Sequence, residues 1–183
     1  LLQALHDADI RLIVDIVPNH CSSAHPLFQE ALDSSPGSPE RELFLFRDGV
    51  GPGGNQPPNN WQSHFGGPAW TRVEDGQWYL HLFDSAQPDF NWDHPAVHDH
   101  LRSVLRFWLD RGVDGFRVDV AHLMKKDPAL PDWGGPANGA QHPDFPTQES
   151  PMFGRPEVHS IFADWRQILD EYSTETGRER MMC

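Results

Sequence analysis

Cysteine is nearly absent from this chain of 183 residues, which contains only Cys21 and Cys183. Two cysteines that far apart form neither a disulfide framework nor a spaced metal-binding motif. The composition therefore excludes a small disulfide-stapled secreted domain, and reduced, cytoplasmic chemistry is the expectation.

Positive charge is also scarce, because 14 Lys and Arg face 27 Asp and Glu and give a net charge of −13. Nucleic acids and anionic membranes select basic surfaces, so neither is expected as a partner. No apolar run is long enough to cross a bilayer. A small neutral substrate is compatible with this balance.

The chain has no initiator methionine, and it starts within an amphipathic helical pattern at Leu1–Leu5. It ends at Met181–Cys183, where a new apolar run begins. We interpret the sequence as an internal part of a longer chain. Its length is sufficient for one domain with a sizeable core.

Helix and strand patterns alternate along the chain. The run from Ile10 to Val17 is almost continuously β-branched, which is typical of a strand buried on both faces of a parallel sheet. An amphipathic helix is predicted from Pro95 to Gly112, followed by a strand over residues 115–120 and a helix over residues 156–172. This order predicts an α/β fold with a parallel sheet, either open or closed into a barrel.

Two stretches rich in proline and glycine interrupt this pattern. Residues 21–93 are too long for a plain loop and predict a small insertion, with a short helix over 25–32 and a hairpin of residues 70–73 and 78–83. Residues 127–156 are expected to be irregular.

Four polar residues are expected at one edge of the sheet. Asp15 and His20 end the first strand, and Arg117 and Asp119 share a face of the next one. Chemistry in parallel α/β folds lies at the carboxyl ends of strands. Taken alone, Arg117 and Asp119 fit a buried functional pair or a structural salt bridge about equally well.

The motifs that contain these residues resemble the α-amylase family of glycoside hydrolases (family 13). Asp15–His20 (DIVPNH) and Gly115–Asp119 (GFRVD) resemble its first and second signatures. Gln87–Trp92 (QPDFNW) and Asn59–Gly67 (NNWQSHFGG) resemble motifs of its α-glucosidase and oligo-1,6-glucosidase branch. The resemblance extends over nearly the whole chain.

The resemblance implies part of a (β/α)8 TIM barrel around strands 3 and 4. Residues 1–20 would be barrel, 21–93 an inserted domain B, and 94–183 barrel again, ending before strand 5. It implies a retaining α-glucosidase in which Asp119 is the nucleophile and Arg117 keeps it ionised. Asp15 and His20 would hold hydroxyls of the sugar that is cleaved, since hydroxyls need carboxylate acceptors and imidazole donors.

Several departures from the family pattern matter. A retaining mechanism needs a second carboxyl group as the general acid, and the resemblance places it in a Gly-Glu pair that we expect beyond Cys183. Of the amylase calcium ligands, Asn19 is present but the Lys-His pair after Asp119 is absent. No metal and no cofactor are therefore expected. Cys21, next to His20, is interpreted as a packing residue.

Two other functions stay open within the same family. One is a transglycosylating relative that acts on sucrose or trehalose, and the other is a non-catalytic barrel like that of transporter heavy chains. The retention of Asp119, Arg117 and His20 favours the enzyme. Val120, which follows the nucleophile, would lie near the leaving sugar, and valine there tends to accompany α-1,6 activity. A short oligosaccharide or α-glucoside is the expected substrate.

Histidines and aromatic residues give weaker predictions. His94 and His98 have helical spacing, but without a third ligand they predict a solvated helix start rather than a zinc site. His122 either lines the cleft or satisfies a strand end. Trp61 and Trp70 are predicted to form the cleft wall, Trp108 and Trp165 to lie in the core, and Phe65 and Phe90 fit either place.

Overall fold

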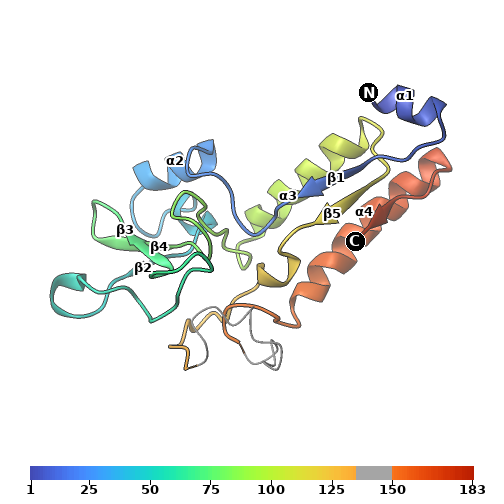
Figure 1. Cartoon of the computed structure of the whole chain (residues 1–183). Helices are drawn as coiled ribbons and strands as arrows, with labels where there is room; N and C mark the ends of the chain where they lie inside the picture. Colours follow the sequence, from blue (N-terminus) through green and yellow to red (C-terminus); the bar gives the residue numbers. More distant parts are fainter. Residues whose placement is uncertain (135–149) are drawn as a thin grey trace.

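The computed structural model describes residues 1–134 and 150–183. Figure 1 shows two groups of elements, a parallel sheet with long helices and a smaller antiparallel sheet. The elements in chain order are α1 (Leu2–Asp7), β1 (Ile13–Ile16), α2 (Pro26–Asp33), η1 (Arg41–Leu43), β2 (Phe46–Asp48), η2 (Pro52–Gly54), β3 (Trp70–Arg72), β4 (Gln77–Leu80), α3 (Pro95–Leu109), β5 (Gly115–Val118), η3 (Ala121–Leu123), α4 (Val158–Thr176) and β6 (Met181–Met182).

The parallel sheet has the order β1-β5-β6. Asp15 lies directly beside Arg117 in the β1–β5 register, which confirms that the two strands are parallel neighbours. Strand β6 adds a third parallel neighbour at residues 181–182, where the sequence indicated only an apolar run. Helices α3 and α4 contact each other along this sheet (Figure 1).

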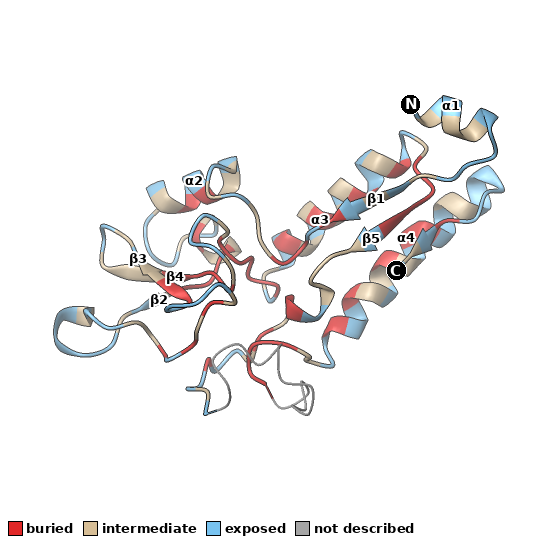
Figure 2. Ribbon diagram, viewed as in Figure 1, coloured by how far each residue is buried: buried red, intermediate tan, exposed pale blue. Residues whose placement is uncertain are grey.

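Within the described residues, only one face of the first strand is buried, whereas the sequence predicts burial of both. Ile16 is buried, but Ile13 is 39% exposed and Val17 is 43% exposed. The buried side chains pack toward α3 and α4, while the opposite face has no covering layer among the described residues (Figure 2). A β-branched run therefore indicates what a strand can bury, and the layers around it decide what is buried.

Both long helices are confirmed, with ends shifted by two to four residues. Helix α3 begins at Pro95, the turn after it contains Gly112 at φ +91°, and its inner face buries Val97, Leu101, Leu105 and Leu109. Helix α4 runs four residues beyond the predicted end, and there the hydroxyl groups of Ser173, Thr174 and Thr176 donate to carbonyls four residues earlier. It ends at Gly177, which has the left-handed conformation common after helices.

The second sheet lies within residues 46–80 and has the antiparallel order β2-β4-β3. The predicted hairpin is confirmed as β3 and β4, with Gly76 at φ +99° in the turn between them. Strand β2, which pairs Phe46 with Tyr79, was not predicted because it is only three residues long. The predicted short helix is present as α2.

The core is continuous between the two sheets. One buried cluster extends from Phe28 of α2 through Phe90 and Trp92 to Trp165 of α4. A second joins the small sheet to residues that follow β5, including Leu123 and Phe153. The division at residues 20 and 93 into barrel and inserted domain remains a prediction. In the part of the chain described, no helix combines the length and apolarity that a membrane span requires.

Candidate active site

The carboxyl ends of β1 and β5 bring three of the predicted site residues into one hydrogen-bonded network. Arg117 donates from Nη1 to Asp15 Oδ2 at 2.6 Å and from Nη2 to Asp119 Oδ1 at 2.9 Å. The hydrogen bond to Asp15 and then the charges of Asp119 and Asp15 raise the pKa of Arg117, so the guanidinium stays cationic. A planar fork suits such a bridge between two carboxylates.

The network lies on the face of the sheet that no other described element covers. The side chains of Arg117 and Asp15 are 54% exposed, and that of Asp119 is 38% exposed. Exposed ion pairs contribute little to folding stability. A guanidinium that bridges two carboxylates at the carboxyl ends of parallel strands is the arrangement expected of a binding or catalytic site.

His20 follows β1 and lies beside the network. Its ring is 5.0 Å from that of Phe83, and its Nε2 atom lies 3.1 Å from Nε2 of Gln87. Burial lowers the pKa of His20, an effect that the charges of Asp89 and Asp119 oppose. The surroundings of His20 thus favour the neutral imidazole, and the ring is within electrostatic reach of Asp119.

Val120 has an unusual backbone conformation directly after Asp119. Its φ of +46° and ψ of +33° lie in the left-handed region, which is strained for a β-branched residue. The half-buried side chain packs against the second core cluster. Val120 therefore turns the chain from β5 into η3, and its proximity to a leaving sugar stays a prediction.

A buried lysine, which the sequence reasoning missed, lies behind His20. The Lys126 ammonium donates to Asn19 Oδ1 at 2.7 Å and forms an ion pair with Asp89 Oδ2 at 2.7 Å. Burial lowers the pKa of Lys126, whereas Asp89 opposes that shift. The Asn19 oxygen, which the amylase pattern assigns to calcium, is therefore already paired with a cation of the chain itself. In the sequence, Lys125 and Lys126 follow a short apolar stretch, and that pattern does not indicate that Lys126 is buried and paired.

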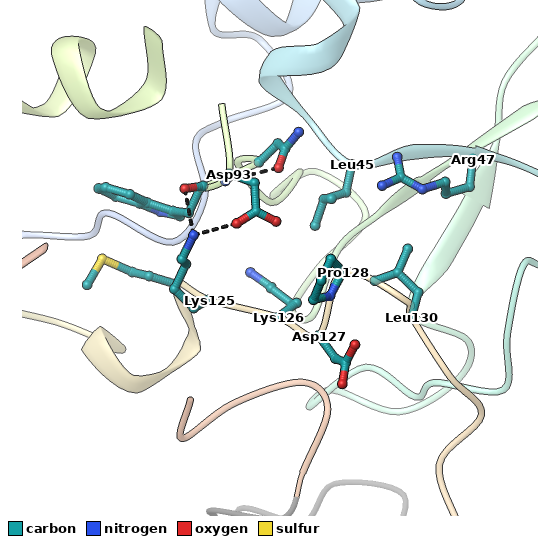
Figure 3. A pocket seen from close by; sticks show the side chains of 11 residues that line it. Leu45, Arg47, Asp93, Lys125, Lys126, Asp127, Pro128 and Leu130 are labelled. Carbon is teal, nitrogen blue, oxygen red and sulfur yellow. Dashed lines mark hydrogen bonds and ion pairs between the residues drawn. The ribbon is translucent and has the colours of Figure 1, made fainter. Parts of the chain in front are cut away.

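The strand-end network of Asp15, Arg117 and Asp119 is called the rim below. A pocket between the small sheet and the segment after η3 is separate from it (Figure 3). There Lys125 donates to the carbonyl oxygen of Trp92 at 3.1 Å and pairs with Asp93. Asp15, Arg117 and Asp119 are not among the residues that line it. The pocket is therefore a junction between elements rather than the substrate site.

The prediction that Trp61 and Trp70 form the cleft wall is wrong. Trp61 is 1% exposed and donates from Nε1 to the Pro131 carbonyl at 2.8 Å, and Trp70 is 3% exposed and donates to Asn59 Oδ1 at 2.7 Å. Both side chains belong to the second core cluster. A tryptophan in a loop-rich segment still packs inward when its N–H finds a buried acceptor.

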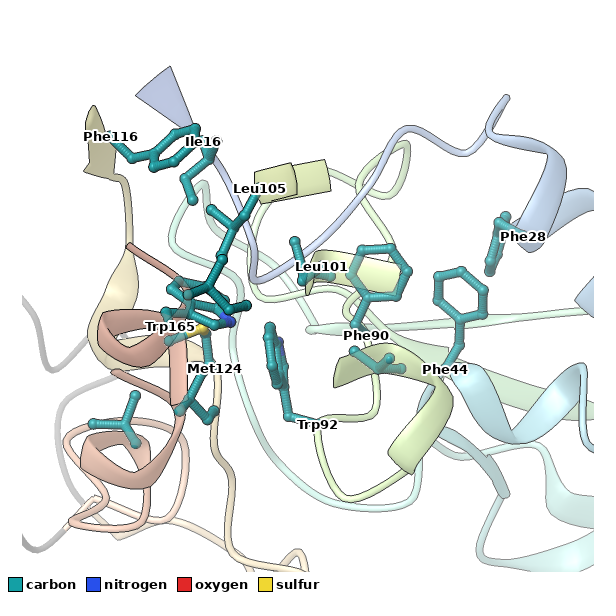
Figure 4. Close-up of a cluster of buried hydrophobic side chains, with 14 of the residues drawn as sticks. Ile16, Phe28, Phe44, Phe90, Trp92, Leu101, Leu105, Phe116, Met124 and Trp165 are labelled. Carbon is teal, nitrogen blue, oxygen red and sulfur yellow. The ribbon is translucent and has the colours of Figure 1, made fainter. Parts of the chain in front are cut away.

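The other aromatic predictions are resolved by burial. Trp165 is fully buried and Trp108 packs half-buried against the same core, as predicted. Phe90 belongs to the core as well, between Phe44 and Trp92 in the cluster that Figure 4 shows. Phe65 is 70% exposed and is in ring contact with Phe83, which itself contacts His20. Phe65 thus remains an aromatic candidate for the cleft.

The remaining polar candidates have structural partners. Cys21 packs against the core, and burial raises the pKa of its thiol to about 12, so it is confirmed as a packing residue. His94 caps α3 by accepting from the Ala96 N–H, and His98 contacts the Trp92 carbonyl. His122 is exposed and lies edge-on to Phe153. Among residues 1–134 and 150–183, no cluster of three potential ligands for a metal ion occurs.

Comparisons with known proteins identify the family. The profile described as "Alpha amylase, catalytic domain" matches residues 1–183. The oligo-1,6-glucosidase of Parageobacillus thermoglucosidasius is 39% identical over 181 residues, which are 98% of this chain and 31% of that protein. The trehalose-6-phosphate hydrolase of Escherichia coli is 50% identical over 124 residues, 67% of this chain and 22% of that protein.

Other relatives differ in what their names state. The human amino acid transporter heavy chain SLC3A1 is 36% identical over 189 residues, covering all of this chain and 27% of that protein. Among solved structures, the trehalose-6-phosphate hydrolase TreA of Bacillus licheniformis aligns with a TM-score of 0.78 and 34% identity. The alignment covers 99% of this chain and 30% of TreA. A trehalulose synthase, MutB, aligns with a TM-score of 0.76 and 32% identity, and the coverage is 98% of this chain and 30% of MutB.

The chain thus spans about a third or less of the length of these relatives. The family match nevertheless includes every residue, and the parallel strands, the rim network and the motifs all lie within it. The chain belongs to the family of the alpha-amylase catalytic domain, and its parallel sheet is part of a (β/α)8 barrel.

Proposed function

We propose that the full-length protein is a retaining α-glucosidase that hydrolyses terminal α-glucosidic bonds of short α-glucosides. The observation that carries this proposal is the Arg117 fork between Asp15 and Asp119 at neighbouring strand ends. The glucosidase names of several relatives support it.

Asp119 is the proposed nucleophile. Within the described part of the chain, the side-chain hydrogen bond to its carboxylate uses Oδ1, which leaves Oδ2 for attack on the anomeric carbon. The fork of Arg117 fixes the plane of that carboxylate, and orientation of a reacting group contributes strongly to rate. Attack forms a bond between the carboxylate and the anomeric carbon while the leaving-group oxygen takes a proton.

The proton would come from a second carboxyl group, about 5–5.5 Å from the nucleophile in retaining enzymes. Asp15 is already bound by Arg117 at 2.6 Å, so we assign it to sugar binding instead. Together with His20, it would hold hydroxyls of the glucosyl unit beside Asp119. The general acid is assigned to a glutamate outside this chain.

A mechanism-based glycosyl probe tests the assignment in the full-length protein. A 2-deoxy-2-fluoro-α-glucosyl compound with a good leaving group, or a glucosyl-configured cyclophellitol aziridine, should label Asp119 with a stoichiometry of one. Peptide mapping by mass spectrometry locates the label. Labelling of Asp15 or of any other residue would refute the role of Asp119.

Transglycosylation is the second candidate, because MutB, one of the aligned structures, is named a trehalulose synthase. Both reactions would pass through the same glucosyl-Asp119, and the acceptor decides between them. Product analysis with sucrose as the substrate distinguishes them, since a transglycosylase releases a rearranged disaccharide and a hydrolase releases glucose and fructose.

The transporter heavy chain is the third candidate, because SLC3A1 shares 36% identity with this chain. A non-catalytic barrel has no need for the Arg117 fork and an exposed Asp119. Absence of any covalent label with the glycosyl probe, in a folded full-length protein, would favour this candidate.

A further inference from the structure

The Gln87–Trp92 motif lies against the segment that contains His20. Backbone hydrogen bonds join Cys21 N–H to the Pro88 carbonyl at 3.2 Å, and Ser23 N–H to the Ala86 carbonyl at 2.7 Å. On the other side of His20, Phe90 N–H donates to the Asn19 carbonyl at 2.9 Å. The end of the 21–93 segment is thus bound, residue by residue, to the chain that leaves β1.

The side chain of Gln87 is fixed at both ends. Its Oε1 accepts from the Asp84 N–H at 3.1 Å, and its own backbone N–H donates to the Asp84 carbonyl at 2.8 Å. Rotating the amide by half a turn would set its NH2 group against the Asp84 N–H. The amide nitrogen therefore faces His20, at 3.1 Å from Nε2.

The other sides of the His20 ring are also held. The Asn19 amide nitrogen, oriented by the Lys126 donation to the amide oxygen, lies 3.3 Å from Nδ1. Because a neutral imidazole accepts at one nitrogen only, the Gln87 donation to Nε2 leaves the proton on Nδ1, and Asn19 is a steric neighbour rather than a second donor. Phe83 contacts the ring at 5.0 Å with a tilt of 52°. Because Phe83 and Gln87 bracket one short turn, a single element of the 21–93 segment contacts the imidazole twice.

We propose that Gln87 is a positioning residue, which acts on the substrate through His20 by fixing the orientation of the imidazole ring. The inference rests on the proposed function, in which His20 holds a sugar hydroxyl; with Nε2 taken by Gln87, the ring donates to that hydroxyl from its Nδ1 N–H. An imidazole that is oriented before the sugar arrives loses less conformational freedom on binding. The motif thereby makes the 21–93 segment part of the sugar pocket without a direct contact with the sugar.

A double-mutant cycle in the full-length protein tests this role. Gln87→Met keeps the length of the side chain and removes the amide. It should lower kcat/KM for p-nitrophenyl α-glucoside by about 10-fold when His20 is present, the size expected for one hydrogen bond. In a His20→Ala background the same change should cost less than about twofold, because its only route to the substrate is gone.

Gln29→Met is the matched control. Gln29 is an exposed glutamine on α2 whose amide donates to the Ser23 carbonyl at 2.7 Å, so the same atoms are removed away from His20. Its kcat/KM should equal that of the wild type. Nitrogen NMR of the histidine-labelled protein gives a readout without turnover, because the ring signals of His20 should shift in Gln87→Met and not in Gln29→Met.

Equal losses from Gln87→Met with and without His20 would overturn the proposal, since they would indicate general loosening of the segment. Unchanged His20 ring signals would overturn it as well. Neither outcome touches the proposed function, which wild-type turnover and covalent labelling of Asp119 test independently.

Discussion

The strand-end rim and the 46–80 sheet use their polar and aromatic residues in opposite ways. At the rim, Asp15, Arg117 and Asp119 are exposed and paired with one another. In the small sheet, Trp70 and Tyr79 are buried and their polar atoms are hydrogen-bonded to the protein. In this chain the charged groups at the strand ends are left accessible, while burial of large rings holds the scaffold around them.

The two regions meet at His20. The rim contributes the residue, and the turn from Phe83 to Gln87 holds its ring. Behind it, the buried pair of Lys126 and Asp89 joins the segment after η3 to the end of the 21–93 segment. A substitution in either region is therefore expected to affect the site. Substitutions in the two regions should change different measurable quantities.

The largest expected effect is on turnover at the rim. In the full-length protein, Asp119→Asn should lower kcat by about 10⁴-fold or more, because the covalent route is lost. The melting temperature should stay close to that of the wild type, since the residue is partly exposed. Asp48→Asn, the same change at an exposed position of β2, should retain activity. A large fall in the melting temperature of Asp119→Asn would contradict the contrast between the two regions.

The next effect is on the stability that the buried ion pair of Lys126 and Asp89 provides. Lys126→Met leaves Asp89 buried without its cation and should lower the free energy of unfolding by about 3–5 kcal/mol. Denaturant unfolding of the full-length protein measures it. Adding Asp89→Asn should recover part of the loss, since the amide can still accept from the Leu82 N–H.

Substitutions of Trp70 and Phe65 should have smaller effects, and these effects distinguish an aromatic residue of the core from one that lines the cleft. Trp70→Phe removes the indole hydrogen bond to Asn59 and should cost about 1–3 kcal/mol of stability with little change in KM. Phe65→Leu, at a 70% exposed position, should change stability by less than about 0.5 kcal/mol and raise KM for oligosaccharides. If Trp70→Phe instead raised KM with little loss of stability, while Phe65→Leu lost stability without a change in KM, Trp70 would again be a candidate for the cleft wall.

The smallest effect is expected at Val120. Val120→Thr conserves β-branching, and hence the strain at φ +46°, while it adds a hydroxyl group. The ratio of kcat/KM for isomaltose to that for maltose should fall by more than about twofold. The change in this ratio should not exceed what a methyl-sized difference in an apolar wall produces, at most about 1–3 kcal/mol in activation free energy. A ratio unchanged within about twofold would remove Val120 as a linkage determinant.

Much of the fold could be predicted because its signals are local. Helices α3 and α4 follow from apolar spacing, and Gly112 and Gly177 lie just beyond their ends. The β3–β4 hairpin follows from two short runs around Gly76. Strand β2 could not be predicted, since three residues carry too little pattern and are selected by pairing with β4.

For the site, the sequence by itself determined which residues meet at the rim. Asp15 and Arg117 lie at the ends of parallel strands, and period-two alternation puts Asp119 on the same side as Arg117. Only the tertiary structure decided that Arg117 bridges Asp15 and Asp119, that Trp61 and Trp70 are buried, and that Gln87 and Lys126 support His20 and Asn19. The physical reason is range: strand alternation acts over a few residues, whereas burial and hydrogen-bond partners depend on segments 60–110 positions apart, as for Gln87 with His20 and Lys126 with Asn19.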